Sequence, residues 1–185
     1  MVAICFDRHL YYPLLYYPED TVPLKMRPLA FDAPSEVQFV RDLEAFYKSP
    51  LGRDIIGKCS LYLLRNADTK AKGLGFALAG NFYPDFLLWL VDDETGEQWL
   101  NFIDPKGLRQ MNLNDPKLGL YKEVKLLQGK LGDPKLTLNA FIVSGTQFES
   151  LLNVSCKQAD LEERNVLFMS DGGPVYLKKM FERIT

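Results

Sequence analysis

Histidine is almost absent from this 185-residue sequence, which contains only His9. Mechanisms that need an imidazole base, such as Ser-His-Asp and Cys-His catalysis, are therefore disfavoured. Zinc hydrolases with two or more histidine ligands are disfavoured for the same reason. The three cysteines (Cys5, Cys59 and Cys156) are far apart and form no Cys-x-x-Cys pair, so neither a zinc ribbon nor a redox motif is expected. Scattered cysteines are typical of a reducing compartment and predict a cytoplasmic protein.

Long apolar runs and an excess of positive charge are also missing. No stretch of 18 or more apolar residues occurs, and the N-terminus lacks the pattern of a signal peptide, so no membrane association is expected. Lysine and arginine number 22 against 24 aspartates and glutamates, which gives a formal net charge of −2. This balance argues against tight DNA binding by the chain alone. It argues less against a catalytic metal site, because such sites gather carboxylates.

The order of the predicted elements indicates an α/β fold. Residues 1–34, rich in tyrosine and proline, are expected to form short strands and turns that lead into one domain over residues 35–185. Hydrophobic periodicity predicts helices at 35–48, 115–130, 146–152 and 174–184, and strands at 59–66, 74–80, 82–91, 98–104, 136–144 and 165–169. The meander strands should be antiparallel and the later strands, which follow helices, parallel. We therefore expect a mixed sheet with helices on both faces.

The first predicted helix carries a carboxylate on its apolar side. Ser35 and Gln38 match a capping box at its start. Glu36 shares a stripe with apolar residues of the same helix (Val40, Leu43 and Tyr47). A carboxylate aimed at the core needs a partner. The alternative is a solvated first-turn glutamate that the helix dipole favours.

Acidic residues stand at the ends of two neighbouring predicted strands. Asp85 opens one strand and Asp104 closes the next, and a polar turn at 92–97 joins them, so the two side chains should converge. Lys106 lies two positions after Asp104 and should project toward the same region. Pro105 cannot donate a ladder hydrogen bond, so regular pairing is expected to stop or bulge near Asp104.

Two close carboxylates are stable mainly when a cation lies between them. Oxygen ligands favour Mg²⁺ or Mn²⁺, which Asp85, Asp104 and the carbonyl of Pro105 would hold, with Glu36 completing the site. Such an ion lowers the pKa of a bound water and neutralises charge on a phosphate. Lys106 would orient the water or stabilise the transition state. Taken alone, a Pro-Asp followed by Asp-x-Lys is a weak signal that surface turns often produce.

The segments FYPDFLLWL at 82–90 and NFIDPKGLR at 101–109 resemble the PD-(D/E)xK nuclease domain of type III restriction enzyme large subunits and related DEAD/DEAH-box helicase-nuclease proteins. The likeness continues in SEVQFVRDL at 35–43, LYLLRN at 61–66, GLGFALAGNFYPDF at 73–86 and FDRHLYYPLL at 6–15, and covers roughly residues 6–145. It implies a restriction-endonuclease-like α/β/α sandwich with a central mixed β-sheet. It also implies Mg²⁺-dependent cleavage of double-stranded DNA, with Glu36, Asp85, Asp104 and Lys106 as the catalytic residues.

The resemblance also implies partners. The family usually carries an ATPase or helicase motor on the same polypeptide, and a methyltransferase/specificity subunit is a further expected partner in restriction or phage defence. Arg109 and Gln110, just after the second motif, are the candidates for substrate contact. The alternative function is a catalytically inactive nuclease-like module that binds DNA or docks a motor, which the acidic charge balance favours.

Two further patterns have simpler explanations. Residues 52–59 (GRDIIGKC) nearly match a phosphate-binding loop, but Cys59 replaces the hydroxyl residue and the segment precedes a predicted strand, so no nucleotide site is expected. Five lysines (Lys117, Lys122, Lys125, Lys130 and Lys135) lie in and after the 115–130 helix. They would either contact DNA phosphates or form a solvated helix face.

Overall fold

A computed structural model describes residues 33–66, 83–110, 112–152 and 154–184, together with the backbone of two short paired strands, β1 (Ala3–Ile4) and β2 (Leu15–Tyr16). The strand predicted at 74–80 and most of the 1–34 segment lie outside the described residues. In the described part of the chain, no helix has the length and apolar character needed to cross a membrane.

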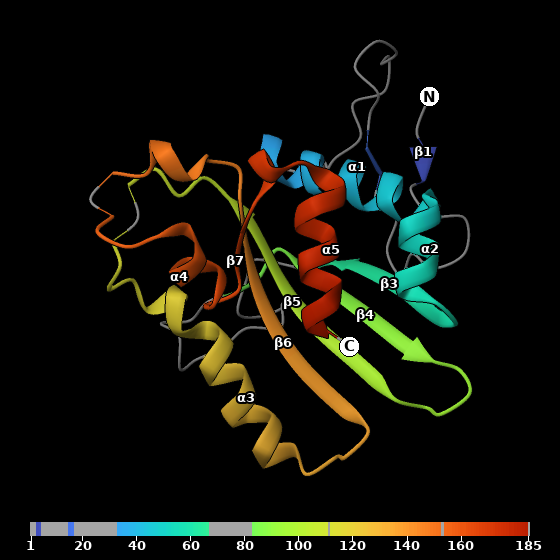
Figure 1. Ribbon diagram of the computed structural model, residues 1–185. Helices are drawn as coiled ribbons and strands as arrows, with labels where there is room; N and C mark the ends of the chain where they lie inside the picture. The colour runs from blue at the N-terminus through green and yellow to red at the C-terminus, as the bar shows by residue number, and fades with distance from the viewer. Residues whose placement is uncertain are drawn as a thin grey trace.

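A five-stranded mixed sheet forms the centre of the fold (Figure 1). Its strands, in spatial order, are β3 (Cys59–Arg65), β4 (Phe86–Asp92), β5 (Gln98–Lys106), β6 (Leu136–Ser144) and β7 (Val166–Phe168). The pairs β3–β4 and β4–β5 are antiparallel, and β5–β6 and β6–β7 are parallel. The predicted change from an antiparallel meander to parallel strands is confirmed. β4 begins at residue 86, later than the predicted 82.

Helices pack on both faces of this sheet. One face carries α1 (Pro34–Lys48), α2 (Pro50–Ile56) and α5 (Gly173–Ile184), and the other carries α3 (Leu120–Leu131) and α4 (Gln158–Glu162). Short 3₁₀ turns occur at Pro116–Gly119, Phe148–Ser150 and Met169–Asp171. Alternate strand residues supply the two faces, as the period of a strand requires: Phe86 and Leu88 face α1, whereas Leu87 faces α3.

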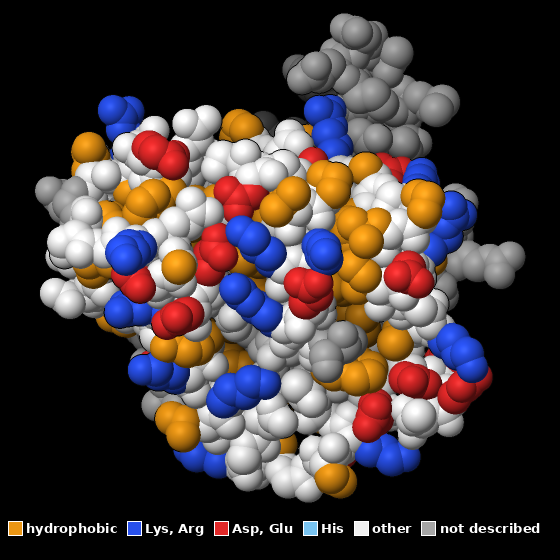
Figure 2. Space-filling model, in the orientation of Figure 1, with side chains coloured by type: hydrophobic (Ala, Val, Ile, Leu, Met, Phe, Trp, Pro, Cys, Tyr) orange, Lys and Arg blue, Asp and Glu red, His pale blue; other side chains and the backbone are white. Residues whose placement is uncertain are grey.

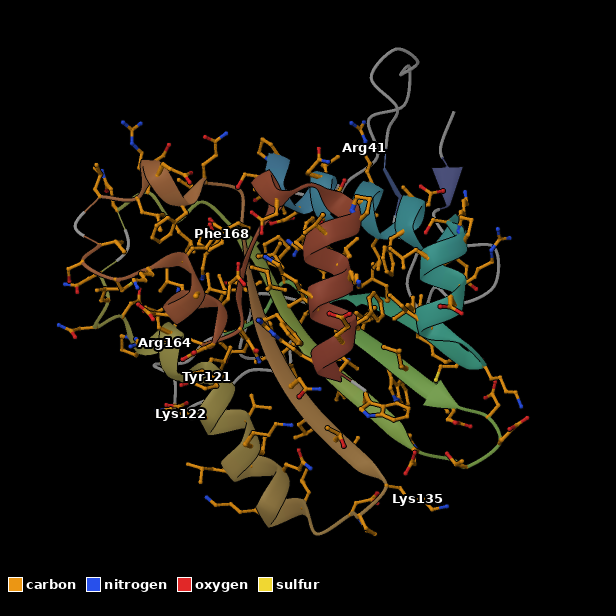
Figure 3. All side chains as sticks on the ribbon, in the orientation of Figure 1. Arg41, Tyr121, Lys122, Lys135, Arg164 and Phe168 are labelled. Carbon is orange, nitrogen blue, oxygen red and sulfur yellow. The ribbon has the colours of Figure 1, made fainter. Side chains whose placement is uncertain are left out.

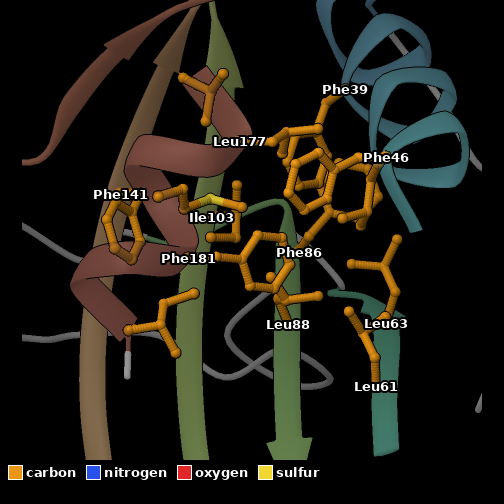
Figure 4. Packing of buried hydrophobic residues seen from close by; sticks show 14 of the residues in the cluster. Phe39, Phe46, Leu61, Leu63, Phe86, Leu88, Ile103, Phe141, Leu177 and Phe181 are labelled. Atoms are coloured by element: carbon orange, nitrogen blue, oxygen red, sulfur yellow. The ribbon is translucent and has the colours of Figure 1, made fainter. Parts of the chain in front are cut away.

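Large aromatic residues lie at the centre of the core beneath α1 and α5, among a greater number of aliphatic ones (Figure 4). The rings of Phe46 and Phe181 stack with centroids 5.3 Å apart, and both side chains are almost fully buried. Phe39 and Phe86 are fully buried beside them. Burial of each such side chain stabilises the fold by roughly 1.5–3 kcal/mol. This cluster fixes α1 across the sheet and therefore fixes where the start of α1 lies.

The predicted capping box is wrong. The N-cap of α1 is Ala33, and no side chain caps the helix there. The Ser35 hydroxyl instead donates to the Pro105 carbonyl at 3.2 Å, and the Gln38 amide donates to Asp42 at 2.7 Å. A tertiary contact with β5 thus replaces the local cap. Pro34 at the start of the helix removes one of the N–H groups that a cap would otherwise satisfy.

Two short helices were not predicted from periodicity, because neither is long enough to show it. α2 begins after Ser49, whose side chain accepts the N–H of Gly52, and ends at Gly57 with φ of 60°. The segment 52–59 that resembles a phosphate loop therefore runs from the end of a helix into β3. α4 spans five residues only.

The expectation that regular pairing stops near Asp104 is correct on one side of β5 only. Antiparallel pairing with β4 ends at Phe86 opposite Ile103. Parallel pairing with β6 continues through Pro105 to Lys106 opposite Ser144. Asp104 thus stands where β5 has lost one neighbour and kept the other, so its side chain lies at an opening in the sheet.

Side chains cover the edge of β6 that β7 leaves unpaired. β7 pairs only with Ile142–Ser144. Further along β6, the N–H of Leu138 donates to the Gln128 side chain at 3.0 Å, and the Asn165 amide donates to the carbonyl of Ala140 at 3.1 Å. Two polar side chains therefore satisfy backbone groups that an edge strand would otherwise expose.

Tyr176→Phe should lower the free energy of unfolding by about 1.5–3 kcal/mol, the range for hydrogen bonds to charged groups. Tyr176 is fully buried on α5 and donates to Asp42 on α1 at 2.9 Å. Burial, together with the Asp42 carboxylate, raises the pKa of Tyr176 far above its usual range, so the hydroxyl remains a donor. Urea denaturation measures the loss. Tyr121→Phe, on α3, is the control, and equal effects of the two substitutions would contradict the prediction.

Candidate active site

Four segments distant in sequence meet at one edge of the sheet: the start of α1, the end of β3, the start of β4 and the end of β5. They bring together Glu36, Asp85, Asp104 and Lys106, which are the four predicted catalytic residues, and a fifth residue that was not predicted, Arg65. Glu36 and Asp104 are only 5% and 6% exposed. Buried carboxylates of this kind need compensating charge or protons.

Asp85 and Asp104 are in contact. Because Phe86 pairs with Ile103, the next residue outward on each strand is an aspartate, and the two carboxyl groups hydrogen-bond to each other. Burial, followed by the charge of Asp104 and this hydrogen bond, raises the pKa of Asp85 to about 7; Glu36 adds to the shift and Arg65 opposes it. The expected convergence of the two acids is confirmed. Near neutral pH the Asp85 carboxyl is therefore protonated in a large fraction of molecules.

Lys106 forms an ion pair with Asp104 through Nζ and Oδ2. The two side chains share a face because they are two positions apart on β5. Oδ2 is buried and makes no hydrogen bond within the described part of the chain, so the ammonium charge beside it is what compensates it. A carboxylate oxygen in this state is a candidate ligand for a further cation.

Arg65, the last residue of β3, links two of the acids. Its guanidinium nitrogens lie 3.1 Å from Glu36 Oε2 and 3.1 Å from Asp85 Oδ1. It also donates to the main-chain carbonyl of Asp85 at 3.1 Å and lies over the ring of Phe86, 5.1 Å from its centroid. Glu36 is therefore a buried and partnered carboxylate, and the interpretation of it as a solvated first-turn residue is wrong.

Asn66, the residue after Arg65, also holds the Pro84–Asp85 segment. Its N–H donates to the Asp85 carbonyl at 2.8 Å, and its side-chain amide donates to the Pro84 carbonyl at 2.8 Å. Asp85 is thus held through its backbone although it stands before the first residue of β4. The signal for this pair in the sequence is an Arg-Asn dipeptide that ends an apolar strand next to the start of its neighbour.

Pro105 docks the first helix onto the site. Its carbonyl accepts the Ser35 hydroxyl, and a Cβ added at Gly145 after β6 would lie 3.4 Å from Ser35 Cβ. A carbonyl oxygen has two lone pairs, so the hydrogen bond from Ser35 leaves one for another partner. The predicted role of Pro105 as a metal ligand is compatible with this contact.

The donor set fits one hard divalent cation. Asp85, Asp104 and the Pro105 carbonyl offer oxygen ligands only, which suits Mg²⁺ or Mn²⁺. The raised pKa of Asp85 and the Lys106 ammonium beside Asp104 Oδ2 mark where positive charge is needed. Within the described ranges, however, no three Asp, Glu, His or Cys side chains are grouped to hold a metal together. Glu36 has an arginine as its partner in place of a metal.

The predicted substrate-contacting residues lie just beyond the end of β5. Arg109 and Gln110 are exposed in a turn. Their loop is tied to the loop after β6, because Leu108 N–H donates to Thr146 Oγ1 at 3.0 Å and Leu152 N–H donates to the Arg109 carbonyl at 2.9 Å. The structure thus places their backbone at the site's edge, and their role in substrate contact stays a prediction.

The lysines in and after α3 do not form one basic patch. Lys125 Nζ donates to Asn139 Oδ1 at 2.9 Å, and Lys135 Nζ donates to the Thr95 carbonyl at 2.9 Å. Figure 3 shows Lys122 on α3 far from Lys135 at the start of β6. On the face seen in Figure 2, lysines and arginines alternate with acidic side chains. These contacts favour structural and solvated roles for the lysines over a DNA-binding surface.

Comparison with known proteins gives no assignment: no family model, no curated protein and no solved structure matches this sequence. What indicates a function is therefore the set of contacts among Glu36, Arg65, Asp85, Asp104 and Lys106, together with the sequence of the segments that carry them.

The metal-free protein should become more stable as the pH falls from 8 toward 5. The pKa of Asp85 is raised from 3.8 to about 7, so the folded state binds this proton more tightly than the unfolded chain does. The resulting stabilisation is complete below pH 3.8 and is lost as the pH rises through about 7. The Asp85 side chain is 24% exposed, so we discount the effect to roughly 1 kcal/mol, or about 2–4 °C in melting temperature.

Melting curves in EDTA across this pH range measure the effect. Asp85→Asn should flatten the pH dependence, whereas Asp93→Asn, at an exposed position in the β4–β5 turn, should keep the wild-type slope. An unchanged slope in Asp85→Asn would contradict the assignment of the raised pKa to Asp85.

Proposed function

We propose that this chain is a Mg²⁺- or Mn²⁺-dependent endodeoxyribonuclease domain with a restriction-endonuclease-like α/β/α fold, part of a restriction or phage-defence helicase-nuclease. The observation that supports it most is the contact between Asp85 and Asp104 at the ends of adjacent strands, with Lys106 beside Asp104. The mixed sheet with helices on both faces is compatible with that fold. Fold and site thus agree with the resemblance in the sequence.

The residues of the site have distinct roles in this proposal. A divalent ion, when bound, lowers the pKa of a coordinated water and offsets charge on the scissile phosphate. Asp85 and Asp104 would hold that ion, with Asp85 in its ionised form. Lys106 Nζ orients the attacking water or neutralises charge growing on a phosphate oxygen. Arg65 keeps Asp85 in position through its side chain and its carbonyl.

The charge of the chain explains why partners belong to the proposal. With a net charge of −2 and interspersed surface charges, this domain offers little general attraction for a polyanion. A motor domain of the parent polypeptide, and a methyltransferase/specificity subunit, would supply the affinity for double-stranded DNA. Arg109 and Gln110 would then contact the DNA next to the cleavage site.

Incubation of the purified chain with supercoiled plasmid and linear duplex DNA tests the proposal. We expect cleavage that requires Mg²⁺ or Mn²⁺ and stops in EDTA. Calorimetric titration with Mn²⁺ in the absence of DNA is the second measurement, and the heat of binding should disappear in Asp85→Asn. A protein that neither cuts DNA nor binds the ion through Asp85 would contradict the proposal.

One observation favours the alternative, a catalytically inactive nuclease-like module that binds DNA or docks a motor. Arg65 and Lys106 already neutralise much of the charge of the acidic cluster, which consists of Glu36, Asp85 and Asp104, without any metal. In that case the same titration would show no ion bound, while the chain would still bind its motor domain or duplex DNA. The two functions are therefore separated by one measurement.

A further inference from the structure

The acidic cluster contains two separate positions for positive charge. One lies between Asp85 and Asp104, whose carboxyl groups are in contact. The other lies between Asp85 and Glu36, where the guanidinium of Arg65 is 3.1 Å from an oxygen of each. Asp85 belongs to both positions, which is possible because a carboxylate has two oxygens and about four lone-pair sites. A cation shared by two carboxylates is the arrangement that a bound divalent ion would adopt.

Arg65 is held firmly in the second position. Its side chain is only 17% exposed and lies over the buried ring of Phe86, the residue with which Arg65 pairs across β3 and β4. A further hydrogen bond to the Asp85 carbonyl fixes the same nitrogen that faces Asp85 Oδ1. A guanidinium cannot lose its charge in a protein. The second position is therefore filled by a permanent cation of the chain itself.

The first position differs in this respect. Lys106 contacts Asp104 Oδ2, but this buried oxygen makes no hydrogen bond to any other described residue. The lysine side chain is 25% exposed, and its ammonium is carried on a flexible four-carbon stem, in contrast to the planar guanidinium of Arg65. Only the position between the two aspartates is therefore open to exchange with an external ion.

We propose that Arg65 takes the place of a second divalent ion, so that the site binds one Mg²⁺ or Mn²⁺ per chain and not two. The inference rests on the proposed function, since it concerns the metal site of that nuclease. It assigns Glu36 to a different role from the one that the sequence predicts. Glu36 is the anchor of Arg65 and thus a positioning residue, and the ion is held by Asp85 and Asp104.

Mn²⁺ titration of the full chain, followed by the electron paramagnetic resonance signal of the free ion, counts the bound ions directly. Wild type should bind one ion. Arg65→Met removes the guanidinium from between Glu36 and Asp85 and should bind two, whereas Arg65→Lys retains the charge and should bind one. The double variant Glu36→Gln/Arg65→Met removes one charge of each sign and should bind one ion with an affinity within about threefold of wild type.

The outcomes separate this inference from the proposed function. Wild type with two ions, folded Arg65→Met with one ion, or a tenfold or greater loss of affinity in the double variant would overturn the role of Arg65 and leave the nuclease proposal standing. A wild-type chain that binds no Mn²⁺, or one whose binding survives in Asp104→Asn, would overturn the metal site itself and the inference with it. Circular dichroism shows whether each variant is folded. If Arg65→Met alone does not fold, the charge-balanced double variant provides the test.

Discussion

Asp104→Asn should lower the rate of the proposed metal-dependent DNA cleavage by roughly 10³-fold or more, because a bound ion would contribute several kcal/mol to the transition state and each 1.36 kcal/mol is a factor of ten in rate. Asparagine preserves the size of the side chain and removes the charge that would hold the ion. Lys106→Ala should cost about 10²-fold or more, in the range for loss of one group that stabilises a developing charge. Both variants should remain folded, since neither side chain belongs to the apolar core.

Single-turnover cleavage of a plasmid at saturating Mg²⁺ measures both effects. Matched controls lie on the exposed β4–β5 turn and at the start of β3: Asp93→Asn and Lys58→Ala change the same kinds of side chain away from the site. These controls should cut at the wild-type rate. Undiminished cleavage by pure Asp104→Asn and Lys106→Ala would refute the roles given to both residues.

Arg65→Met will lower the free energy of unfolding by about 3–5 kcal/mol at pH 8, the cost of removing one partner of a buried ion pair. The substitution leaves Glu36, 5% exposed, without the guanidinium that neutralises it, and it removes a hydrogen bond to the backbone of Asp85. In a domain of this size the melting temperature should fall by roughly 6–20 °C. Glu36→Gln/Arg65→Met should recover most of that loss, because an amide needs no counter-charge.

Thermal melts of the two variants and wild type in EDTA measure this double-mutant effect. Arg53→Met, at an exposed position on α2, controls for the loss of an arginine as such and should change the melting temperature by no more than about 2 °C. An Arg65→Met protein with the melting temperature of wild type, or a double variant that is less stable than Arg65→Met, would show that the Glu36–Arg65 pair does not stabilise the fold.

The sheet could be predicted from the sequence because its signals are local. β5 and β6 coincide with apolar runs of the right length. Asp92, the last residue of β4, begins the turn to β5 and accepts the N–H groups of Glu94 and Thr95 at 2.8 and 2.9 Å. The short helices α2 and α4 could not be predicted in this way, since their apolar residues do not complete two turns. The sequence does not predict the first turn of α1 correctly, because Ser35 forms its hydrogen bond with a strand residue 70 positions away and does not cap the helix.

Some residues of the candidate site can likewise be predicted from local signals in the sequence, and others cannot. Asp104 and Lys106 share one face of a strand, and Asp85 stands on the neighbouring antiparallel strand. The two-residue period of a strand and the position of one turn are therefore enough to place all three. Arg65 requires more: its partners are known only once the register of β3 on β4 and the tilt of α1 over the sheet are known. From the sequence, Glu36 fits either a core-facing carboxylate that needs a partner or a solvated first-turn glutamate, and only the packing of α1 decides between them.

The polar cover on the free part of β6 has a consequence for self-association. Gln128 and Asn165 occupy the hydrogen-bonding positions at Leu138 and Ala140 that an incoming strand would need. An extended peptide, or the same strand of another molecule, would have to displace both amides before it could add to the sheet there. If two copies of the chain pair to cut both strands of a duplex, they would therefore associate through another surface. The same two amides also disfavour fibre growth by strand addition at this edge of the sheet.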